Sequence, residues 1–144
     1  MKIVVQRVNW GKVTVDNKLI AQIKAGYVVL LGVKKGDEEK TADILVQKLL
    51  NLRIMPDENN KMNLSIQDIK GEILVVSQFT LYAETSGRRP GFTQGAMPQE
   101  AKKLCDYFVE QLKKSGLRIL SGEFGAYMQV DLCNDGPVTI IMES

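Results

Sequence analysis

The stretch Tyr27-Val28-Val29-Leu30-Leu31-Gly32-Val33 is almost entirely apolar and rich in β-branched residues. An apolar run without polar alternation is typical of a strand that is covered on both faces. The run is far shorter than the ~20 residues that a helix needs to span a bilayer. It therefore predicts a central strand around which a sheet is built.

The segments on either side of this strand supply a hairpin and a helix. Apolar and polar residues alternate from Val13 to Ile23 around the pair Asp16-Asn17, which predicts a β-hairpin. After the central strand, acidic residues mark the first turn of a helix expected to end near Arg53. The expected apolar face of this helix consists of Ile44, Leu45, Leu49 and Leu52.

The second half of the chain predicts further strands and one more helix. Strands are expected at residues 54–55, 72–79, 117–120, 127–133 and 138–142, and residues 61–71 look irregular. A polar loop at 83–97 precedes a helix that begins at Pro98, stops at Gly116 and carries the apolar stripe Ala101, Leu104, Cys105, Phe108 and Leu112. We expect a mixed α/β fold of six or seven strands and two main helices, in a single domain over residues 1–144.

Composition limits the chemistry. The chain of 144 residues has no histidine, which removes Ser-His-Asp and Cys-His activation of a nucleophile. Cys105 and Cys133 lack a CxxC spacing, so we expect free thiols, no metal site and no cofactor. The N-terminal residues meet a charge too early for a signal peptide, which predicts a soluble cytoplasmic protein without membrane contact. A net charge of +2 does not indicate a polyanion partner.

Two motifs carry candidate chemistry, and each has a structural alternative. Ser77-Gln78-Phe79-Thr80 follows a buried strand, where polar side chains can enter a pocket, but Ser77 and Thr80 could equally cap backbone groups. Asn134-Asp135-Gly136-Pro137 combines a glycine, which adopts unusual backbone angles, with a proline whose preceding bond can be cis. The alternative is an ordinary tight turn between two strands.

Isolated residues leave more alternatives open. Arg7 could orient a carbonyl or carboxylate, or be a solvated charge at a strand edge. The pair Arg88-Arg89 could contact phosphates or serve solubility. Aromatic residues such as Trp10 and Phe92 stack on bases less often than they pack in cores. Carboxylates show no paired spacing, and Asp37, Glu38 and Glu39 fit a role at the helix start.

Taken together, several motifs resemble the D-aminoacyl-tRNA deacylase (D-tyrosyl-tRNA(Tyr) deacylase) family. They occur in the family's order: Gln6-Arg7-Val8, Leu30-Leu31-Gly32-Val33, Asn51-Leu52-Arg53-Ile54, Lys61-Met62-Asn63, Ser77-Gln78-Phe79-Thr80-Leu81, Arg88-Arg89-Pro90, Phe124-Gly125-Ala126 and Asn134-Asp135-Gly136-Pro137-Val138-Thr139. The chain departs from the family at Gly91, where serine is common, and at Tyr127, where aspartate is common.

The resemblance implies a curved, barrel-like sheet with two main helices and a homodimer that acts on the 3′ end of D-aminoacyl-tRNA, not on DNA. Gly136 and Pro137, joined by a cis bond, would reach into the partner's pocket, bind the α-amino group and exclude L-side chains. Arg7 matches the arginine that helps to fix their orientation. Ser77, Gln78, Phe79 and Thr80 match the pocket motif, and Ala96 and Met128 match positions near the substrate.

The resemblance implies release of free D-amino acid and tRNA, with glycyl-tRNA mischarged on tRNA(Ala) as a second substrate. Because no histidine is available to deprotonate Thr80, we expect the 2′-OH of the terminal ribose to activate or position the water. Gln78 and the Phe79 N–H are candidate donors to the oxyanion. The alternatives are Thr80 as nucleophile, a non-catalytic RNA-binding module, and a related deacylase of shifted specificity.

Overall fold

The central strand predicted from the apolar run is β3, Gly26–Gly32. The structure is a computed structural model that describes all residues from 1 to 144. Successive side chains of β3 enter different cores: Val28 packs inside the curved sheet, and Val29 packs against the helices. The prediction of a strand covered on both faces is confirmed.

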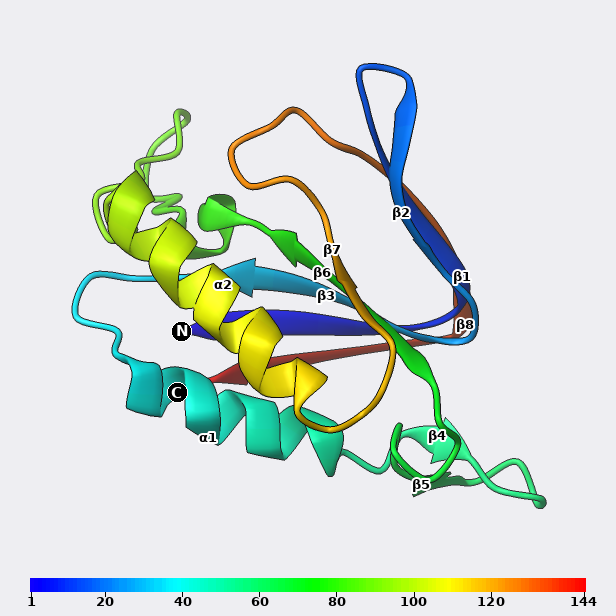
Figure 1. Cartoon of the computed structure of the whole chain (residues 1–144). Helices are drawn as coiled ribbons and strands as arrows, with labels where there is room; N and C mark the ends of the chain where they lie inside the picture. The colour runs from blue at the N-terminus through cyan, green and yellow to red at the C-terminus, as the bar shows by residue number, and fades with distance from the viewer.

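Six strands form the main sheet, which curls into a barrel-like shape (Figure 1). Their bounds are β1 Lys2–Val15, β2 Lys18–Ile23, β3 Gly26–Gly32, β6 Glu72–Ser77, β7 Ile119–Ser121 and β8 Gln129–Glu143. β1 pairs antiparallel with β2, β3 and β8, whereas β3, β6 and β7 run parallel. Because β2 also contacts β6 and β7, the sheet encloses an inner core of Val8, Val13, Val15, Ala21, Ile23, Val28, Leu74 and Val76.

Two helices cover the outer face of the sheet. α1, Glu39–Leu50, connects β3 to the segment before β6, and α2, Pro98–Lys113, precedes β7. The two helices pack on each other and on the sheet, on the same side of the molecule in Figure 1. Phe108 and Leu112 of α2 are fully buried, as their stripe predicted. Neither α1 nor α2 combines the length and the apolar character needed to cross a membrane.

The predicted apolar face of α1 is wrong at one position. Ile44 is 40% exposed, and the buried residues are Ala42, Leu45, Val46, Leu49 and Leu50. The helix stops at Leu50, before the expected end near Arg53, because Asn51 leaves the helical backbone angles, with φ −97° and ψ 1°, and its side-chain Nδ2 donates to the Gln47 carbonyl at 2.8 Å. Leu52 therefore lies beyond the helix, half-buried against the core.

The structure has eight strands where six or seven were predicted. The segment 61–71, expected to be irregular, contains the short strand β5, Met62–Leu64, which pairs with β4, Met55–Pro56. β6 ends at Ser77 and not at Phe79, because the chain turns there into the 3₁₀-helix η1, Phe79–Tyr82. The predicted strand 117–120 is shifted to Ile119–Ser121.

The largest correction concerns the last strand. Residues 127–133 and 138–142 were expected to be two strands, but residues 129–143 form one strand, β8, of 15 residues, and 127 and 128 precede it. β8 continues through Gly136 and Pro137, where its register with β1 shifts between Gln6 and Val8 and again between Val8 and Trp10. A bulge of this kind bends a strand without ending it. The interpretation of these residues as a tight turn between strands is therefore wrong.

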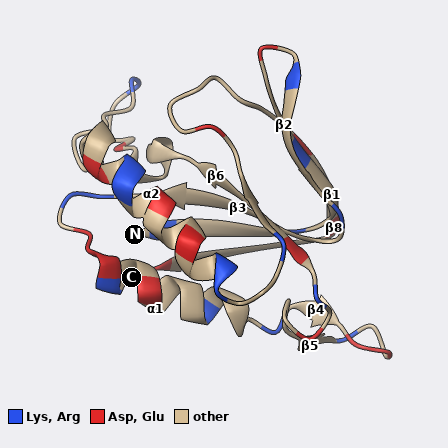
Figure 2. Cartoon of the chain, in the orientation of Figure 1, with Lys and Arg blue, Asp and Glu red and all other residues tan.

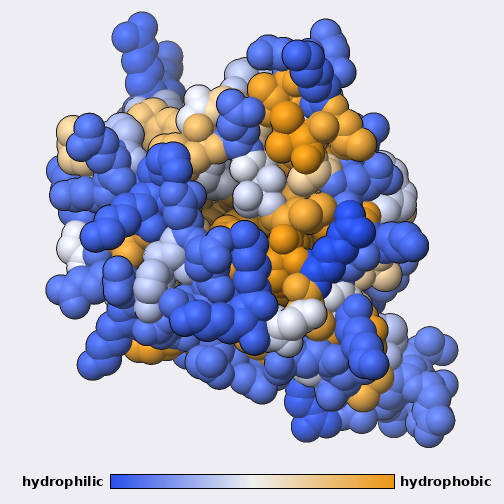
Figure 3. Space-filling model, viewed as in Figure 1, coloured by the Kyte–Doolittle hydropathy of each residue, from blue (hydrophilic) through white to orange (hydrophobic).

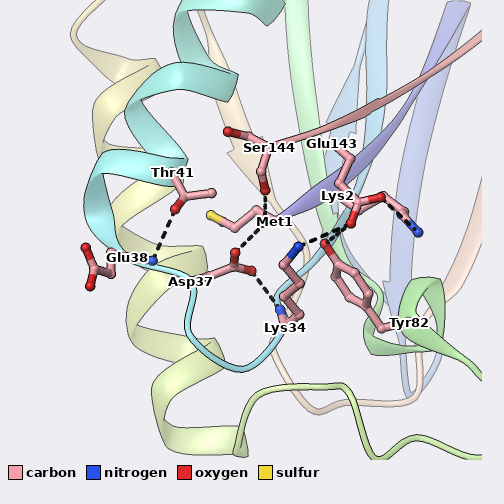
Figure 4. Close-up of polar contacts among 9 residues, drawn as sticks. All are labelled: Met1, Lys2, Lys34, Asp37, Glu38, Thr41, Tyr82, Glu143 and Ser144. Atoms are coloured by element: carbon pink, nitrogen blue, oxygen red, sulfur yellow. Dashed lines mark hydrogen bonds and ion pairs between the residues drawn. The ribbon is translucent and has the colours of Figure 1, made fainter.

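The two termini lie side by side against the start of α1 (Figure 4). The Met1 ammonium group donates to Asp37 Oδ1 at 2.6 Å and to the Ser144 carbonyl at 2.9 Å. Burial lowers the pKa of this amino group, and the hydrogen bond to Asp37 opposes that shift. Asp37 also accepts a hydrogen bond from the Lys34 N–H. It was predicted to serve at the start of the helix, but its carboxylate binds the N-terminus instead. The cap position is taken by Glu38, whose N–H donates to Thr41 Oγ1.

Candidate active site

A cavity of about 490 Å³ lies where β6 ends, between the start of α2 and the segment that joins β7 to β8. Figure 3 shows apolar side chains exposed between α2 and this segment, with hydrophilic groups around them. Its lining comes from several parts of the chain: Val76, Ser77, Gln78, Phe79, Phe92, Gly95, Ala96, Pro98, Ala101, Phe124, Gly125, Ala126, Tyr127, Met128 and Val130. A mainly apolar cavity with a few polar groups is typical of a small-molecule site.

The Ser77-Gln78-Phe79 segment enters the cavity because β6 stops and turns there. The Gln78 N–H donates to the Leu31 carbonyl at 2.8 Å, which ties the turn to the end of β3. Gly32 allows η1 to lie directly over β3, since a Cβ at this position would fall 3.0 Å from the Leu81 Cβ and 3.1 Å from the Gln78 carbonyl oxygen. Packing at the strand end therefore fixes the backbone of one cavity wall.

Thr80 is placed differently from the other three residues of its motif. It does not line the cavity, and its Oγ1 accepts a hydrogen bond from Gln78 Nε2 at 2.5 Å. No side chain caps the start of η1, so the alternative in which Ser77 and Thr80 cap backbone groups there is not what the structure has.

Burial raises the pKa of the nearby Cys105 thiol to about 12, so this thiol stays protonated and is a poor nucleophile.

The opposite walls bring in the other predicted pocket residues. Ala96 reaches the cavity from the loop before α2, where its N–H donates to the Val33 carbonyl at 3.1 Å. Met128 reaches it because Gly122 leaves room: a Cβ there would lie 2.5 Å from the Met128 sulfur. Phe79 and Phe92 meet edge to face with ring centroids 5.0 Å apart, and both line the cavity. Phe92 is therefore a pocket residue and not core packing.

Gly136 and Pro137 lie elsewhere, on the exposed bulge of β8, and the bond between them is cis. Arg7 holds this bulge. Its Nε donates to the Asp135 carbonyl at 3.1 Å and lies 3.0 Å from Asp135 Oδ2, while its Nη1 donates to the Ile54 carbonyl at 2.6 Å. Because Arg7 is only 9% exposed on a strand with neighbours on both sides, its interpretation as a solvated edge charge is wrong.

The chain does not bring the bulge to its own cavity. Val130 of β8 lines the cavity, and Gly136 is six residues further along the same strand. At about 3.3 Å per residue, the two positions are roughly 15–20 Å apart along a bent strand. The structure thus unites Ser77, Gln78, Phe79, Ala96 and Met128 at one site, and Arg7, Gly136 and Pro137 at another.

Sequence reasoning missed two walls of the cavity. Phe124 was noted only inside a motif, and Val130 only as part of an alternating strand; that alternation was the available signal for its inward position. The residues Pro98 and Ala101 gave no signal, because only the tertiary packing of α2 brings them to the cavity. No group of three or more His, Cys, Asp or Glu side chains is placed to hold a metal ion.

Comparison with known proteins agrees with the motifs. Residues 4–143 match the model of the family described as D-Tyr-tRNA(Tyr) deacylase. The chain is 56% identical to a D-aminoacyl-tRNA deacylase of Thermosipho melanesiensis and 53% identical to one of Clostridioides difficile, in each case over 100% of this chain and 97% of the relative.

Two solved structures have the same fold. One is described as c-Myc DNA Unwinding Element Binding Protein, with a TM-score of 0.94, 45% identity and coverage of 100% of this chain and 99% of that one. The other, described as a probable eukaryotic D-amino acid tRNA deacylase, has a TM-score of 0.87 at 18% identity, covers 99% of this chain and 98% of that one, and supports the fold alone. The expected mixed α/β fold with a barrel-like sheet and two helices is thereby confirmed, and the chain belongs to the D-Tyr-tRNA(Tyr) deacylase family.

Proposed function

We propose that this chain hydrolyses the ester bond of D-aminoacyl-tRNA and releases a free D-amino acid and tRNA. The observation that carries the proposal is the cavity at the end of β6, which Ser77, Gln78 and Phe79 line in a chain of this family. The cavity is large enough for an aminoacyl group, and Ser77 and Gln78 place polar side chains at one wall. We place the reaction in the cytoplasm, where aminoacyl-tRNA is used, with residues 1–144 as the catalytic domain.

The mechanism that fits these residues uses a water molecule as nucleophile. Water attacks the ester carbonyl carbon, the bond to the ribose 3′-oxygen breaks, and that oxygen leaves with a proton. With no histidine in the chain, the neighbouring 2′-OH of the substrate positions the water and relays the proton. Gln78 and the N–H of Phe79, the first residue of η1 and therefore without an intrahelical acceptor, stabilise the oxyanion.

Replacement of Thr80 tests this mechanism. Its hydroxyl lies outside the cavity lining and accepts from Gln78, with no imidazole in the chain to deprotonate it. Thr80→Ala is therefore expected to keep kcat within about tenfold of the wild type, since only one hydrogen bond that orients Gln78 is lost. Single-turnover hydrolysis of D-tyrosyl-tRNA measures this, with Thr80→Ser as the control. Complete loss of turnover in Thr80→Ala, rescued by serine, would make Thr80 the nucleophile.

The pocket is completed, in our proposal, by a second copy of the chain. The cavity and the Gly136-Pro137 bulge are too far apart to act together within one chain. β8 pairs only with β1, so its other edge is free along 15 residues, and Ile141 on this strand is 68% exposed. Long bare strand edges are rare in monomers. A homodimer that covers this edge would bring Gly136 and Pro137 to the partner's cavity, where their carbonyls accept from the substrate's α-amino group.

Glycyl-tRNA is a second expected substrate for a simple steric reason. A backbone gate that rejects L-aminoacyl esters acts by leaving no room for an L-side chain. Glycine has no side chain, so such a gate does not exclude it. Glycyl-tRNA mischarged on tRNA(Ala) would then be hydrolysed by the same residues.

One experiment tests the proposed function against its alternatives. D-tyrosyl-, L-tyrosyl- and glycyl-tRNA are each incubated with the chain, and ester loss is followed. We expect hydrolysis of the D-tyrosyl and glycyl esters and retention of the L-tyrosyl ester. Binding of tRNA without ester loss would instead indicate an RNA-binding module, and hydrolysis of the L-ester would indicate shifted specificity. Binding of the chain to DNA is measured in the same experiment, because one similar solved structure is described by a DNA target.

A further inference from the structure

The Arg88-Arg89 pair stands apart from the other arginines of the chain. Arg7 binds Asp135 and Ile54, Arg53 donates to Asn63, and Arg118 lies 3.8 Å from Glu72. Arg88 and Arg89 are exposed and make no hydrogen bond or ion pair with the rest of the chain. Figure 2 shows their positive charge at the tip of the loop that precedes α2.

The loop that carries the pair is closed on itself. The Glu84 N–H donates to the Gly91 carbonyl at 2.8 Å, and the Gly91 N–H donates to the Glu84 carbonyl at 2.9 Å. The Thr93 hydroxyl adds a hydrogen bond to Glu84 Oε1 at 2.6 Å. Reciprocal backbone bonds define a narrow hairpin, and the two arginines occupy its tip.

Both ends of this hairpin are connected to segments that line the cavity. On one side, Glu84 follows η1, whose first residue Phe79 lines the cavity. On the other side, Phe92 follows Gly91 directly, lines the cavity and packs on Phe79 at 5.0 Å between ring centroids. The base of the hairpin is therefore fixed relative to the cavity mouth, as a binding loop on a rigid scaffold requires.

The distance from the tip to the cavity suits a neighbouring part of a polymeric substrate. Arg89 is three residues from Phe92, so its backbone lies at most about 10 Å from the rim, the length of three residues of extended chain. Neither arginine lines the cavity, so we place both outside the part that would hold the aminoacyl group. A nucleic-acid strand that leads into the cavity has phosphates at about this distance from its end, and a guanidinium group without a protein partner can donate two parallel hydrogen bonds to phosphate oxygens.

We infer that Arg88 and Arg89 bind the phosphodiester backbone of the tRNA acceptor end, next to the terminal nucleotide whose ester enters the cavity. This inference rests on the proposed function and adds to it a contact by which the tRNA itself is recognised. The arginines act on substrate binding and not on the bond that breaks. Their contribution belongs to phosphates, so it is independent of base sequence and decreases with salt.

The test compares two substrates that share the ester but differ in phosphates. D-tyrosyl-tRNA carries the backbone, whereas D-tyrosyl-adenosine has the same ester and no phosphate. In the double variant Arg88→Ala/Arg89→Ala we expect KM for D-tyrosyl-tRNA to rise at least about tenfold at low salt with kcat unchanged. The dependence of log affinity on log salt should flatten by about 1.4, from about 0.7 for each of two phosphates on a single strand. Hydrolysis of D-tyrosyl-adenosine should not change.

Two control variants separate the contact from its surroundings. Lys40→Ala/Lys48→Ala removes the same charge from exposed positions of α1, which does not line the cavity, and should leave the KM and the salt dependence near those of the wild type. Arg88→Lys/Arg89→Lys keeps the charge and should show the salt dependence of the wild type. It should recover only part of the affinity that the alanine variant loses, because lysine lacks the planar guanidinium group that donates two parallel hydrogen bonds.

Three outcomes would overturn the inference. The first is an unchanged KM and salt dependence in the alanine variant. The second is an equal loss on D-tyrosyl-adenosine, which would mean that the loop only supports the cavity. The third is an equal effect of the two lysine replacements on α1. If the wild-type chain hydrolyses neither ester, the proposed function fails, and fluorescence anisotropy with labelled uncharged tRNA decides the arginine contact separately: equal affinity of wild type and alanine variant overturns it.

Discussion

The cavity at the end of β6 and the Gly136 bulge on β8 are built in opposite ways. The cavity is concave, and side chains from β6, η1, α2 and the segment before β8 line it. The bulge is a convex, exposed stretch of backbone that a single buried side chain, Arg7, holds from behind. One region offers a space for a ligand, and the other offers backbone groups without a space.

This contrast fits the different roles that we propose for the two regions. A space formed by side chains can change its selectivity through many substitutions, whereas a backbone device depends on a few residues that fix its shape. Val130 lies at the cavity and Gly136 further along the same strand, so β8 joins the two regions rigidly and holds them apart. Our proposal of a second copy of the chain follows from that separation.

The largest expected effect comes from Gly136→Ala. A Cβ at this position would lie 2.9 Å from Val138 Cγ2, 3.0 Å from Val138 N and 3.3 Å from Arg7 Nη2, at a φ of +126° that L-residues rarely adopt. The bulge must shift, and a displacement near 1 Å costs on the order of 100-fold in turnover. We expect such a loss for D-tyrosyl-tRNA hydrolysis, while the cavity stays intact. Activity near that of the wild type would remove the bulge from the reaction.

Mixing variants shows whether the bulge acts across subunits. Ala96→Phe fills the cavity of its own chain but leaves its bulge intact, the reverse of Gly136→Ala. If the regions act in trans, a reassorted equal mixture of the two inactive variants contains dimers with one intact site. About a quarter of the wild-type activity should then return, from random pairing in a symmetric dimer. If they act within one chain, the mixture stays inactive.

The second largest effect is expected for Arg7, through stability. Arg7→Ala leaves the Ile54 carbonyl without its donor at 2.6 Å and releases Asp135. A lost hydrogen bond from a charged group together with an unsatisfied carbonyl costs about 2–3 kcal/mol of the free energy of unfolding. Urea denaturation measures this. Arg118→Ala is the control, because its exposed guanidinium only approaches Glu72 at 3.8 Å and should cost no more than about 0.5 kcal/mol. Equal losses in both variants would contradict a special role for Arg7.

How far the sequence predicts these two regions depends on how local their causes are. The alternation around Asp16-Asn17 and the apolar stripe of α2 act through neighbouring residues, and the predicted hairpin and helix are present. The continuity of β8 through Gly136 depends instead on its pairing with β1, more than 120 residues away in sequence, which no local pattern records. For the same reason the tendency of Gly-Pro to form a turn did not end the strand: β8 pairs with β1 both before and after these two residues.

The cavity was predictable in part for a similar reason. The segment Ser77-Gln78-Phe79 was found because a buried strand ends there, a local signal. The contributions of Pro98 and Ala101 come from the docking of α2, and the burial of Arg7 comes from strands on both sides of β1. The role of Asp37 at the N-terminus likewise arises from residues that meet only in the folded chain.

A smaller effect is expected at the cavity rim, at Tyr127. This side chain is 90% exposed although it lines the cavity, so its removal should not change the free energy of unfolding. An exposed aromatic ring at the mouth is a stacking surface for a nucleobase, and Tyr127→Ala should raise KM for D-tyrosyl-tRNA by roughly tenfold with kcat unchanged. Tyr127→Phe keeps the ring and should bind like the wild type. If phenylalanine fails to rescue KM, the hydroxyl and not the ring makes the contact.

The smallest effect separates the two regions by pH. On the side of the bulge, the hairpin β4–β5 follows Ile54, and its carboxylate Asp57 accepts hydrogen bonds from the N–H groups of Lys61 and Asn59. These bonds, that of Lys61 foremost, hold the pKa of Asp57 below its usual value. The stabilisation is therefore complete above about pH 4, near the unfolded pKa, and is lost as pH falls through the lower folded pKa. The cavity lining contains no carboxylate.

Hydrogen exchange below about pH 4 should therefore show falling protection at the Asn59 and Lys61 amides while the Gln78 and Ala96 amides of the cavity keep theirs. The effect is local, because the hairpin is a small element whose only strand pairing is between β4 and β5. Asp57→Asn removes the titrating group and should make the protection of the hairpin lower and independent of pH. If the asparagine variant keeps the pH dependence, the titrating group is Asp68, whose pKa hydrogen bonds from Ser65 also lower. In that case the acid-sensitive part of the bulge side is the turn before β6, and the hairpin only follows it.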